Sequence, residues 1–197
     1  MKRISKLLVL SIIPAMLSGC GNQPQEETIK VIDMEGAEVI VPKDVKHVAA
    51  ISQSASDLMM AFGLGEKITG TYRSFTYNTW VNELYPQAAN FKAYSYSVTA
   101  EELLNDGIDL VIIQDTENAQ SFKNAGLPVV AVHQYSPTGA FDDEVYEIAD
   151  ILSTIFPEAK DKAEAWKSEV KATINDIKEK TLECTWGMNL FPKSYNN

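Results

Sequence analysis

Short apolar segments alternate with helical patterns from residue 46 onward, and this alternation is the strongest constraint on the fold. The β-rich segments are residues 47–51, 67–70, 109–113 and 128–132. The helical patterns that follow the first three lie at 54–62, 77–84 and 119–125. Strands that alternate with helices form βαβ units around a mainly parallel sheet. The sequence therefore predicts an α/β fold.

Two helix starts carry capping-box patterns, in which a hydroxyl and a carboxylate satisfy free backbone amides of the first turn. Thr99 with Glu102 is the full form, and Ser54 with Asp57 is a weaker variant. The patterns predict one helix that begins at Ser54 and another that begins after Thr99.

A hairpin precedes the alternating region, and two helices follow it. Residues 28–32 and 39–42 flank a turn at 34–36, which is typical of an antiparallel hairpin. Residues 142–156 carry an apolar helical face, and a longer helix runs from Pro157, placed in its first turn, to about residue 180. We therefore expect a three-layer α/β lobe with an N-terminal hairpin and a long C-terminal helix.

The first twenty residues have the order of an export signal. Three basic residues precede an apolar run at 7–17, which is interrupted by Ser11 and Pro14 and is too short for the ~20 residues that span a membrane. Residues 17–20, Leu-Ser-Gly-Cys, resemble the lipobox of bacterial lipoproteins. The resemblance implies cleavage before Cys20 and a diacylglycerol on its thiol.

The mature chain is expected to be acidic and held by its lipid on the extracytoplasmic face of the cell membrane. Residues 1–19 form the signal peptide and 20–27 a tether. Without the signal, 14 basic residues stand against 27 acidic ones, which argues against binding to nucleic acid or to anionic lipid surfaces. The other cysteine is Cys184, so a lipidated Cys20 leaves no intrachain disulfide.

Several short motifs occur together in an order that is similar to one family. They are IDMEG at 32–36, SASDL at 54–58 after the first parallel strand, KITG at 67–70, TAEELL at 99–104 before DLVI at 109–112, and GLPV at 126–129. Together with the lipobox they resemble the class III substrate-binding lipoproteins of ABC importers, the cobalamin and iron-siderophore type.

The resemblance implies two α/β lobes bridged by one long helix, with the ligand in the cleft between them. Here residues 28–157 would form the N-terminal lobe and 158–181 the bridging helix. The tail at 182–197 shows neither strand alternation nor the family pattern, and its sixteen residues are too few for a second lobe. We expect a truncated form with a half-site for a ferric siderophore or a related metal chelate, such as haem or cobalamin, delivered to an ABC permease.

Ligands of open parallel sheets lie beyond the carboxyl ends of the strands, and this rule selects the candidate site. Successive strands are followed by Ser52, Gln53 and Ser54, by Tyr72, Arg73 and Ser74, by Gln114 and Asp115, and by His133, Gln134 and Tyr135. The resemblance adds Lys92, Tyr94 and Tyr96 in the loop before the Thr99 helix. Aromatic faces and cationic donors suit a large anionic chelate, whereas the alternative is a set of half-buried rim residues with Arg73 paired to a surface carboxylate.

The remaining chemistry-bearing residues have simpler expected roles. His47 begins a buried-looking strand, which leaves His133 without a partner imidazole, so we expect no bare metal site and no resident cofactor. Glu83 lies where the family places an acidic residue that docks on the permease, and a solvated helix carboxylate is the alternative. Trp80 and Trp166 lie on helical stripes and are predicted to be core residues.

A binding protein has two alternatives, an envelope hydrolase and a lipoprotein that only contacts other proteins. An envelope hydrolase would need a serine on a tight strand-to-helix turn with a histidine base, but the sequence has no Gly-x-Ser-x-Gly pattern, and Ser52 or Ser54 is better explained as a helix cap. We therefore predict that the chain is not an enzyme. A surface lipoprotein that acts only as a protein-interaction module remains the alternative.

Overall fold

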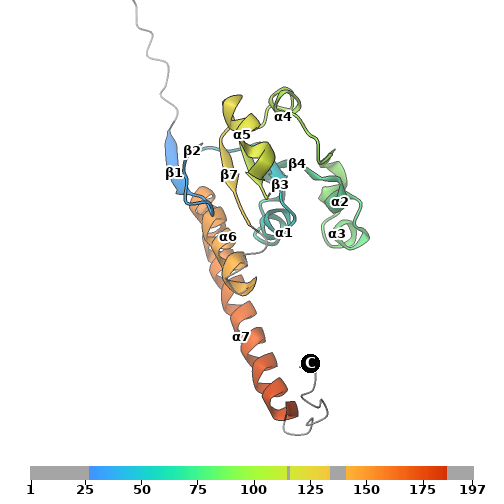
Figure 1. Ribbon diagram of the computed structural model, residues 1–197. Helices are drawn as coiled ribbons and strands as arrows, with labels where there is room; N and C mark the ends of the chain where they lie inside the picture. Colours follow the sequence, from blue (N-terminus) through green and yellow to red (C-terminus); the bar gives the residue numbers. More distant parts are fainter. Residues whose placement is uncertain (1–26, 115, 134–140, 186–197) are drawn as a thin grey trace, which may run out of the picture.

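The fold is built on one parallel sheet of five strands, seen in a computed structural model that describes residues 27–114, 116–133 and 141–185 (Figure 1). The strands are β3 (Val48–Ile51), β4 (Ile68–Tyr72), β5 (Lys92–Tyr94), β6 (Leu110–Ile113) and β7 (Val129–Ala131). Their order across the sheet is β5-β4-β3-β6-β7, and every neighbouring pair is parallel. The α/β class predicted from the alternation is confirmed.

Helices connect the strands and follow the last one. Between the strands lie α1 (Gln53–Ala61), α2 (Arg73–Thr76), α3 (Thr79–Leu84), α4 (Ala100–Asn105) and α5 (Thr116–Asn124), with short 3-10 turns η1 (Gly65–Lys67) and η2 (Pro86–Asn90). After β7 come α6 (Phe141–Ile155), η3 (Pro157–Ala159) and α7 (Lys160–Thr185). Pro157 opens η3, in line with its predicted first-turn position.

The sheet separates two apolar cores, which makes the lobe three-layered. Side chains alternate along β3, so that Val48 and Ala50 face one core while Ala49 and Ile51 face the other. The first core is covered by α1, α6, the start of α7 and the N-terminal hairpin, and the second by α4 and α5. Strands buried on both faces explain why the β-rich segments are continuously apolar rather than alternating.

The N-terminal hairpin forms as predicted. Strands β1 (Thr28–Ile32) and β2 (Glu38–Pro42) pair antiparallel, with Thr28 opposite Pro42. The buried side chains of the hairpin, Val31, Val39 and Val41, join the first core. The turn between the strands is held by Asp33, whose carboxylate accepts hydrogen bonds from the amides of Glu35 and Ala37.

One of the two predicted helix caps is confirmed and the other is wrong. The Thr99 hydroxyl accepts a hydrogen bond from the amide of Glu102, 3.2 Å away, at the start of α4. Helix α1, by contrast, is capped by Ser52, whose hydroxyl accepts from the amide of Ala55. The cap lies two residues earlier than predicted because β3 ends at Ile51 and the chain turns at once.

Strand β5 was not predicted, because the sequence analysis placed Lys92 and Tyr94 in a loop. The strand has three residues and lies at the edge of the sheet, beside β4. Gly70 of β4 makes room for it, since a Cβ there would lie 2.5 Å from the Tyr94 ring and 2.8 Å from the Lys92 carbonyl oxygen. So short a strand carries no periodicity by which it could be recognised.

The long helix α7 is buried only at its start. Ala159 and Ala163 are fully buried, Trp166 and Val170 are half-buried, and Ile177 is 54% exposed. Trp166 packs against the first core as expected, but Trp80 is 73% exposed, so the prediction that it is a core residue is wrong. None of the helices in the described residues is both long enough and apolar enough to cross a membrane.

Candidate functional site

The order of the strands reverses between β3 and β6, at the carboxyl edge of the sheet. The chain runs from β3 outward through β4 and β5, then returns to the other side of β3 to form β6 and β7. Connections therefore leave β3 and β6 in opposite directions, which is the arrangement in which open α/β sheets bind ligands. The two strand ends are joined directly, because the amide of Gln114 donates to the carbonyl oxygen of Ile51 at 3.1 Å.

The residues after β3 are largely committed to holding the fold. Ser52 is 1% exposed, and its carbonyl oxygen accepts a hydrogen bond from the Ser56 hydroxyl at 2.8 Å in addition to its own capping role. Gln53 and Ser54 are half-buried, and the Gln53 amide donates to the Asp57 carboxylate at 3.2 Å. The structure thus places Ser52 at the carboxyl end of β3 with its hydroxyl already engaged.

An aromatic pair with a neighbouring cation lies at the end of β4. The rings of Tyr72 and Tyr96 have centroids 4.8 Å apart at an interplanar angle of 41°. Tyr96 is 72% exposed, and Arg73 and Ser74 follow Tyr72 as exposed residues at the start of α2. The structure therefore brings three of the predicted residues, Tyr72, Arg73 and Tyr96, to one part of the carboxyl edge.

Lys92 and Tyr94 do not join that group, because both are turned toward α4. The Lys92 ammonium pairs with Asp106 at 2.7 Å and with Glu102 at 3.0 Å, and the hydrogen bonds to these two carboxylates raise its pKa. Tyr94 is 1% exposed, and its hydroxyl donates to Asp106 at 2.9 Å. Burial, reinforced by that hydrogen bond, raises the pKa of the Tyr94 phenol. In the structure both side chains are thus bonded to α4 and its cap and lie apart from the Tyr72–Tyr96 pair.

His133, at the end of β7, lies against the hairpin turn. Its Nε2 is 2.7 Å from a carboxylate oxygen of Glu35, and its backbone amide lies 3.3 Å from the Met34 sulfur. Glu35 was not among the predicted site residues. No local signal could have found it, because the contact joins residues about a hundred positions apart.

Helix α7 passes over the carboxyl edge. Gly63, just past the end of α1, lies beside Lys162, whereas Ser54 and Asp57 near the start of α1 share a hollow with Val170 and Ile174. The helix therefore runs antiparallel to α1, and its last turns extend beyond the sheet edge (Figure 1). The hollow, of about 510 Å³, is mainly apolar and is also lined by Leu84, Tyr85 and Trp166.

The remaining predicted residues lie apart from this edge or outside the described residues. Glu83 is exposed on α3. Cys20, Asp115, Gln134 and Tyr135 fall outside the described residues, as do the signal peptide and most of the tether and tail. Among the residues that the structure does describe, no three His, Cys, Asp or Glu side chains are grouped to hold a metal ion.

Comparison with known proteins identifies the fold. The chain matches no family profile. It is 24% identical to an uncharacterised ABC transporter substrate-binding lipoprotein, YvrC of Bacillus subtilis, over 91% of this chain. A periplasmic solute-binding protein from Veillonella parvula superposes on 78% of the chain with a TM-score of 0.66 and 24% identity. This chain has the fold of an ABC-transporter substrate-binding protein.

Other proteins with the substrate-binding fold carry different ligands in their names. The petrobactin-binding protein YclQ of Bacillus subtilis covers 78% of the chain with a TM-score of 0.65 and 16% identity, and the heme-binding protein HmuT covers 88% with a TM-score of 0.54 and 21% identity. These relatives are named as binding proteins and not as enzymes, in agreement with the sequence prediction.

The match covers only part of each relative. The chain spans 59% of the YvrC lipoprotein, 48% of the Veillonella protein and 53% of YclQ. The substrate-binding fold described here therefore corresponds to about half of the length of these relatives.

Proposed function

We propose that this chain is a substrate-binding lipoprotein of an ABC importer and that it contributes one wall of a site for an anionic metal chelate. The observation that carries the proposal is the group of half-buried Tyr72 with exposed Tyr96 and Arg73 at the carboxyl edge of the sheet, the edge at which open α/β sheets bind ligands. An exposed arginine that follows one ring of an aromatic pair in the chain suits a ligand that combines conjugated rings with negative charge.

The names of the relatives support the class of ligand. YclQ is named for petrobactin and HmuT for heme, and both are metal-chelating molecules. A ferric siderophore, haem or cobalamin would place its flat or charged faces on the Tyr72–Tyr96 pair. The YvrC relative is named a lipoprotein, which supports lipidation of this chain at Cys20 and a location on the extracytoplasmic face of the membrane.

The permease is proposed to dock on α3. Glu83 is exposed there, beside two large exposed apolar residues, Trp80 and Leu84, which are 73% and 68% exposed. Large apolar side chains that are grouped on a surface are typical of a site that contacts another protein, whereas single exposed ones are ordinary. Tyr77, 73% exposed at the end of α2, extends the same surface.

Binding of ferric chelates to the purified chain tests the site. One wall supplies part of the contacts of a cleft, so we expect weak binding, micromolar or poorer. Arg73→Ala should weaken binding of ferric siderophores by roughly tenfold to a hundredfold, because a charge-assisted hydrogen bond is lost. Quenching of intrinsic fluorescence by ferric and iron-free siderophores, haem and cobalamin at fixed salt provides the measurement.

The matched control is Lys160→Ala, which removes an exposed cation at the start of α7, far from the aromatic pair. It should bind like the unsubstituted chain. Equal affinity of the Arg73→Ala variant for the ferric form would remove Arg73 from the site. Absence of binding across the whole panel would favour the protein-interaction alternative.

A further inference from the structure

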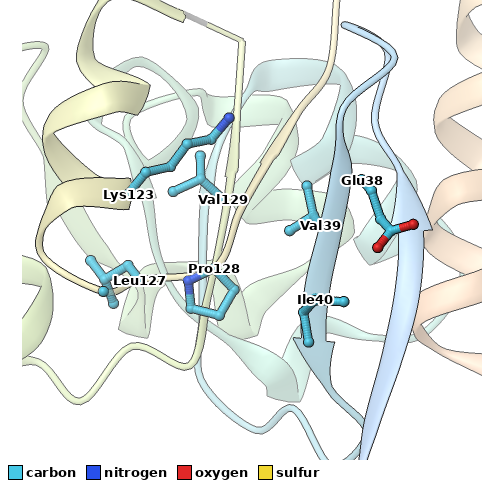
Figure 2. Close-up of a pocket in the computed structure, with 8 residues that line it drawn as sticks. Glu38, Val39, Ile40, Lys123, Leu127, Pro128 and Val129 are labelled. Atoms are coloured by element: carbon cyan, nitrogen blue, oxygen red, sulfur yellow. The ribbon is translucent and has the colours of Figure 1, made fainter.

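The sheet edge formed by β7, on the side of the lobe away from Tyr72 and Tyr96, borders an open groove. Its other wall is β2 of the hairpin, and its volume is about 300 Å³ (Figure 2). The groove is lined by Glu38, Val39 and Ile40 from β2, by Lys123 and Gly126 at the end of α5, and by Leu127, Pro128 and Val129. The two strands are not paired with each other, since β1 and β2 form a separate sheet.

The hydrogen-bond pattern of the hairpin shows which backbone groups of β2 face this groove. The amide of Asp33 donates to the carbonyl of Ala37, and the amide of Lys43 donates to that of Glu27. In an antiparallel pair, bonded and non-bonded positions alternate. The backbone groups of Val39 are therefore turned toward β1, whereas those of Glu38 and Ile40 are turned away from it, toward β7.

The hydrogen bonds between β6 and β7 show which backbone groups of β7 face the groove. The amide of Val111 donates to the carbonyl of Pro128, and the amide of Val132 donates to that of Ile113, each at 2.9 Å. Residues 128, 130 and 132 are thus turned toward β6, so Val129 and Ala131 present their amide and carbonyl groups to the outer edge.

The groove is closed at one end and open along the rest. At the closed end the Ala131 carbonyl accepts from the Met34 amide at 3.1 Å, and the Ala131 amide donates to the Asp33 carboxylate at 3.4 Å. Further along, none of the bonds among described residues outside the two ladders involves the backbone groups of Val129, Ile40 or Glu38. Two unpaired strand edges therefore face each other across the open part.

The charge in the groove is unbalanced. Glu38 is already paired with Lys30 of β1 at 2.9 Å. Lys123 is exposed at the rim and forms no ion pair with any residue in the described part of the chain. The free charge is therefore positive, next to an apolar floor that includes Ile40, Leu127 and Pro128.

We propose that this groove binds an extended polypeptide strand that carries an acidic side chain. A β-strand is the ligand whose amide and carbonyl groups can pair with edges on both sides at once. Its apolar side chains would lie on Leu127 and Pro128, and its carboxylate would pair with Lys123. The proposal shares no residue with the chelate site, so it stands or falls independently of the proposed function.

The test uses the purified chain and a synthetic peptide, N-acetyl-Thr-Val-Thr-Val-Glu-amide, with binding followed by NMR titration. Ile40→Pro removes an amide that faces the groove and leaves the β1–β2 ladder intact, because that amide is turned away from β1. We expect at least a tenfold loss of affinity. Ile32→Pro is the matched control, since Ile32 occupies an outward-facing position on the far edge of β1 and is 59% exposed.

Two further measurements keep the test decisive if Ile40→Pro does not fold. A peptide N-methylated at its backbone amides should bind at least tenfold more weakly to the unsubstituted chain, because it cannot donate to the strand edges. Lys123→Gln should abolish the preference for the glutamate peptide over a glutamine analogue. Undiminished binding of the N-methylated peptide, or no binding of the parent peptide at its solubility limit, would overturn the proposal.

Discussion

The two edge strands of the sheet are held in different ways. At β5, the side chains of Lys92 and Tyr94 both bind Asp106, and Glu102 adds a second carboxylate, so a network of side chains ties the short strand to α4. At β7, the contacts gather at the strand end, where the Asp33 carboxylate, the Met34 amide and Glu35 bind Ala131 and His133, and the groove along the rest of the strand stays open. Contacts at both ends of β5 hold that strand along its length, whereas contacts at one end of β7 hold only the hairpin turn.

The largest effect is expected from Asp33→Ala, which removes the carboxylate that joins the hairpin turn to the end of β7. Asp33 is 2% exposed and accepts hydrogen bonds from the amides of Glu35, Ala37 and Ala131. Its loss leaves these donors without their partner, and we expect the free energy of unfolding to fall by about 3 kcal/mol. Urea denaturation of the purified protein provides the measurement.

The control for Asp33→Ala is Asp44→Ala, which removes an exposed carboxylate paired with Lys46 at 3.0 Å. Exposed pairs contribute little, so this variant should change stability by less than about 0.5 kcal/mol. If Asp33→Ala behaves like this control, the hairpin turn is not anchored by its carboxylate.

Gly70→Ala should have a smaller effect, at the opposite edge. The added methyl would collide with the Tyr94 ring and with the backbone carbonyl of Lys92, and backbone cannot move aside cheaply. Overpacking of this kind costs about 2 kcal/mol. Gly65→Ala is the matched control, because its nearest neighbours are the flexible ends of Met60 and Gln87. Equal unfolding free energies for the two variants would show that β5 does not hold Tyr94 where it is described.

Tyr94→Phe measures the contribution of one hydrogen bond of the β5 network, the bond from the Tyr94 hydroxyl to Asp106. At neutral pH we expect a loss of about 1 kcal/mol, since the hydroxyl bond to Asp106 goes while Lys92 remains. Burial raises the pKa of Tyr94 above its value in the unfolded chain, so the folded state keeps a proton that the unfolded state releases. Stability should therefore fall as the pH rises above about 10.

The Tyr94→Phe variant should lose less stability than the unsubstituted protein over that alkaline range. Urea denaturation at a series of pH values from 8 to about 11 gives both curves. Tyr77→Phe serves as the control, because Tyr77 is 73% exposed and is not part of the β5 network. Parallel curves for the Tyr94→Phe and unsubstituted chains would contradict the assignment.

Periodicity predicted the fold where the elements are long enough to show it. The four buried strands and the helices between them follow from apolar runs such as 110–113, which are buried on both faces. The start of α1 was misplaced because Ser52 and Ser54 are both competent caps, and only the end of β3 decides between them. Strand β5 was missed because its three residues pair only with β4.

The positions of the candidate site residues were predictable in part for a related reason. The rule about strand ends needs only the strand positions, so it placed Tyr72 and Arg73 at the carboxyl end of β4, where the structure has them. It could not give the direction of Tyr94, because a residue assigned to a loop has no defined face. Once β5 is a strand beside β4, the ring of Tyr94 is fixed toward the core and Tyr96 lies beyond the strand end. The contact of His133 with Glu35 depends on the docking of the hairpin and carries no local signal.

Because α7 is buried only at its start, a small rotation there moves the far end of the helix over a larger distance. Ala163 near its start and Ala159 of the preceding η3 turn are fully buried, and the ammonium of Lys167 is bonded to Asp150 of α6. At 1.5 Å per residue, the stretch from Ala163 to Thr185 is about 33 Å long. A rotation of about 5° at the buried end would then displace the far end by about 3 Å. Motions too small to disturb the packing around Ala163 would thus produce larger displacements at the end of α7 that extends beyond the sheet.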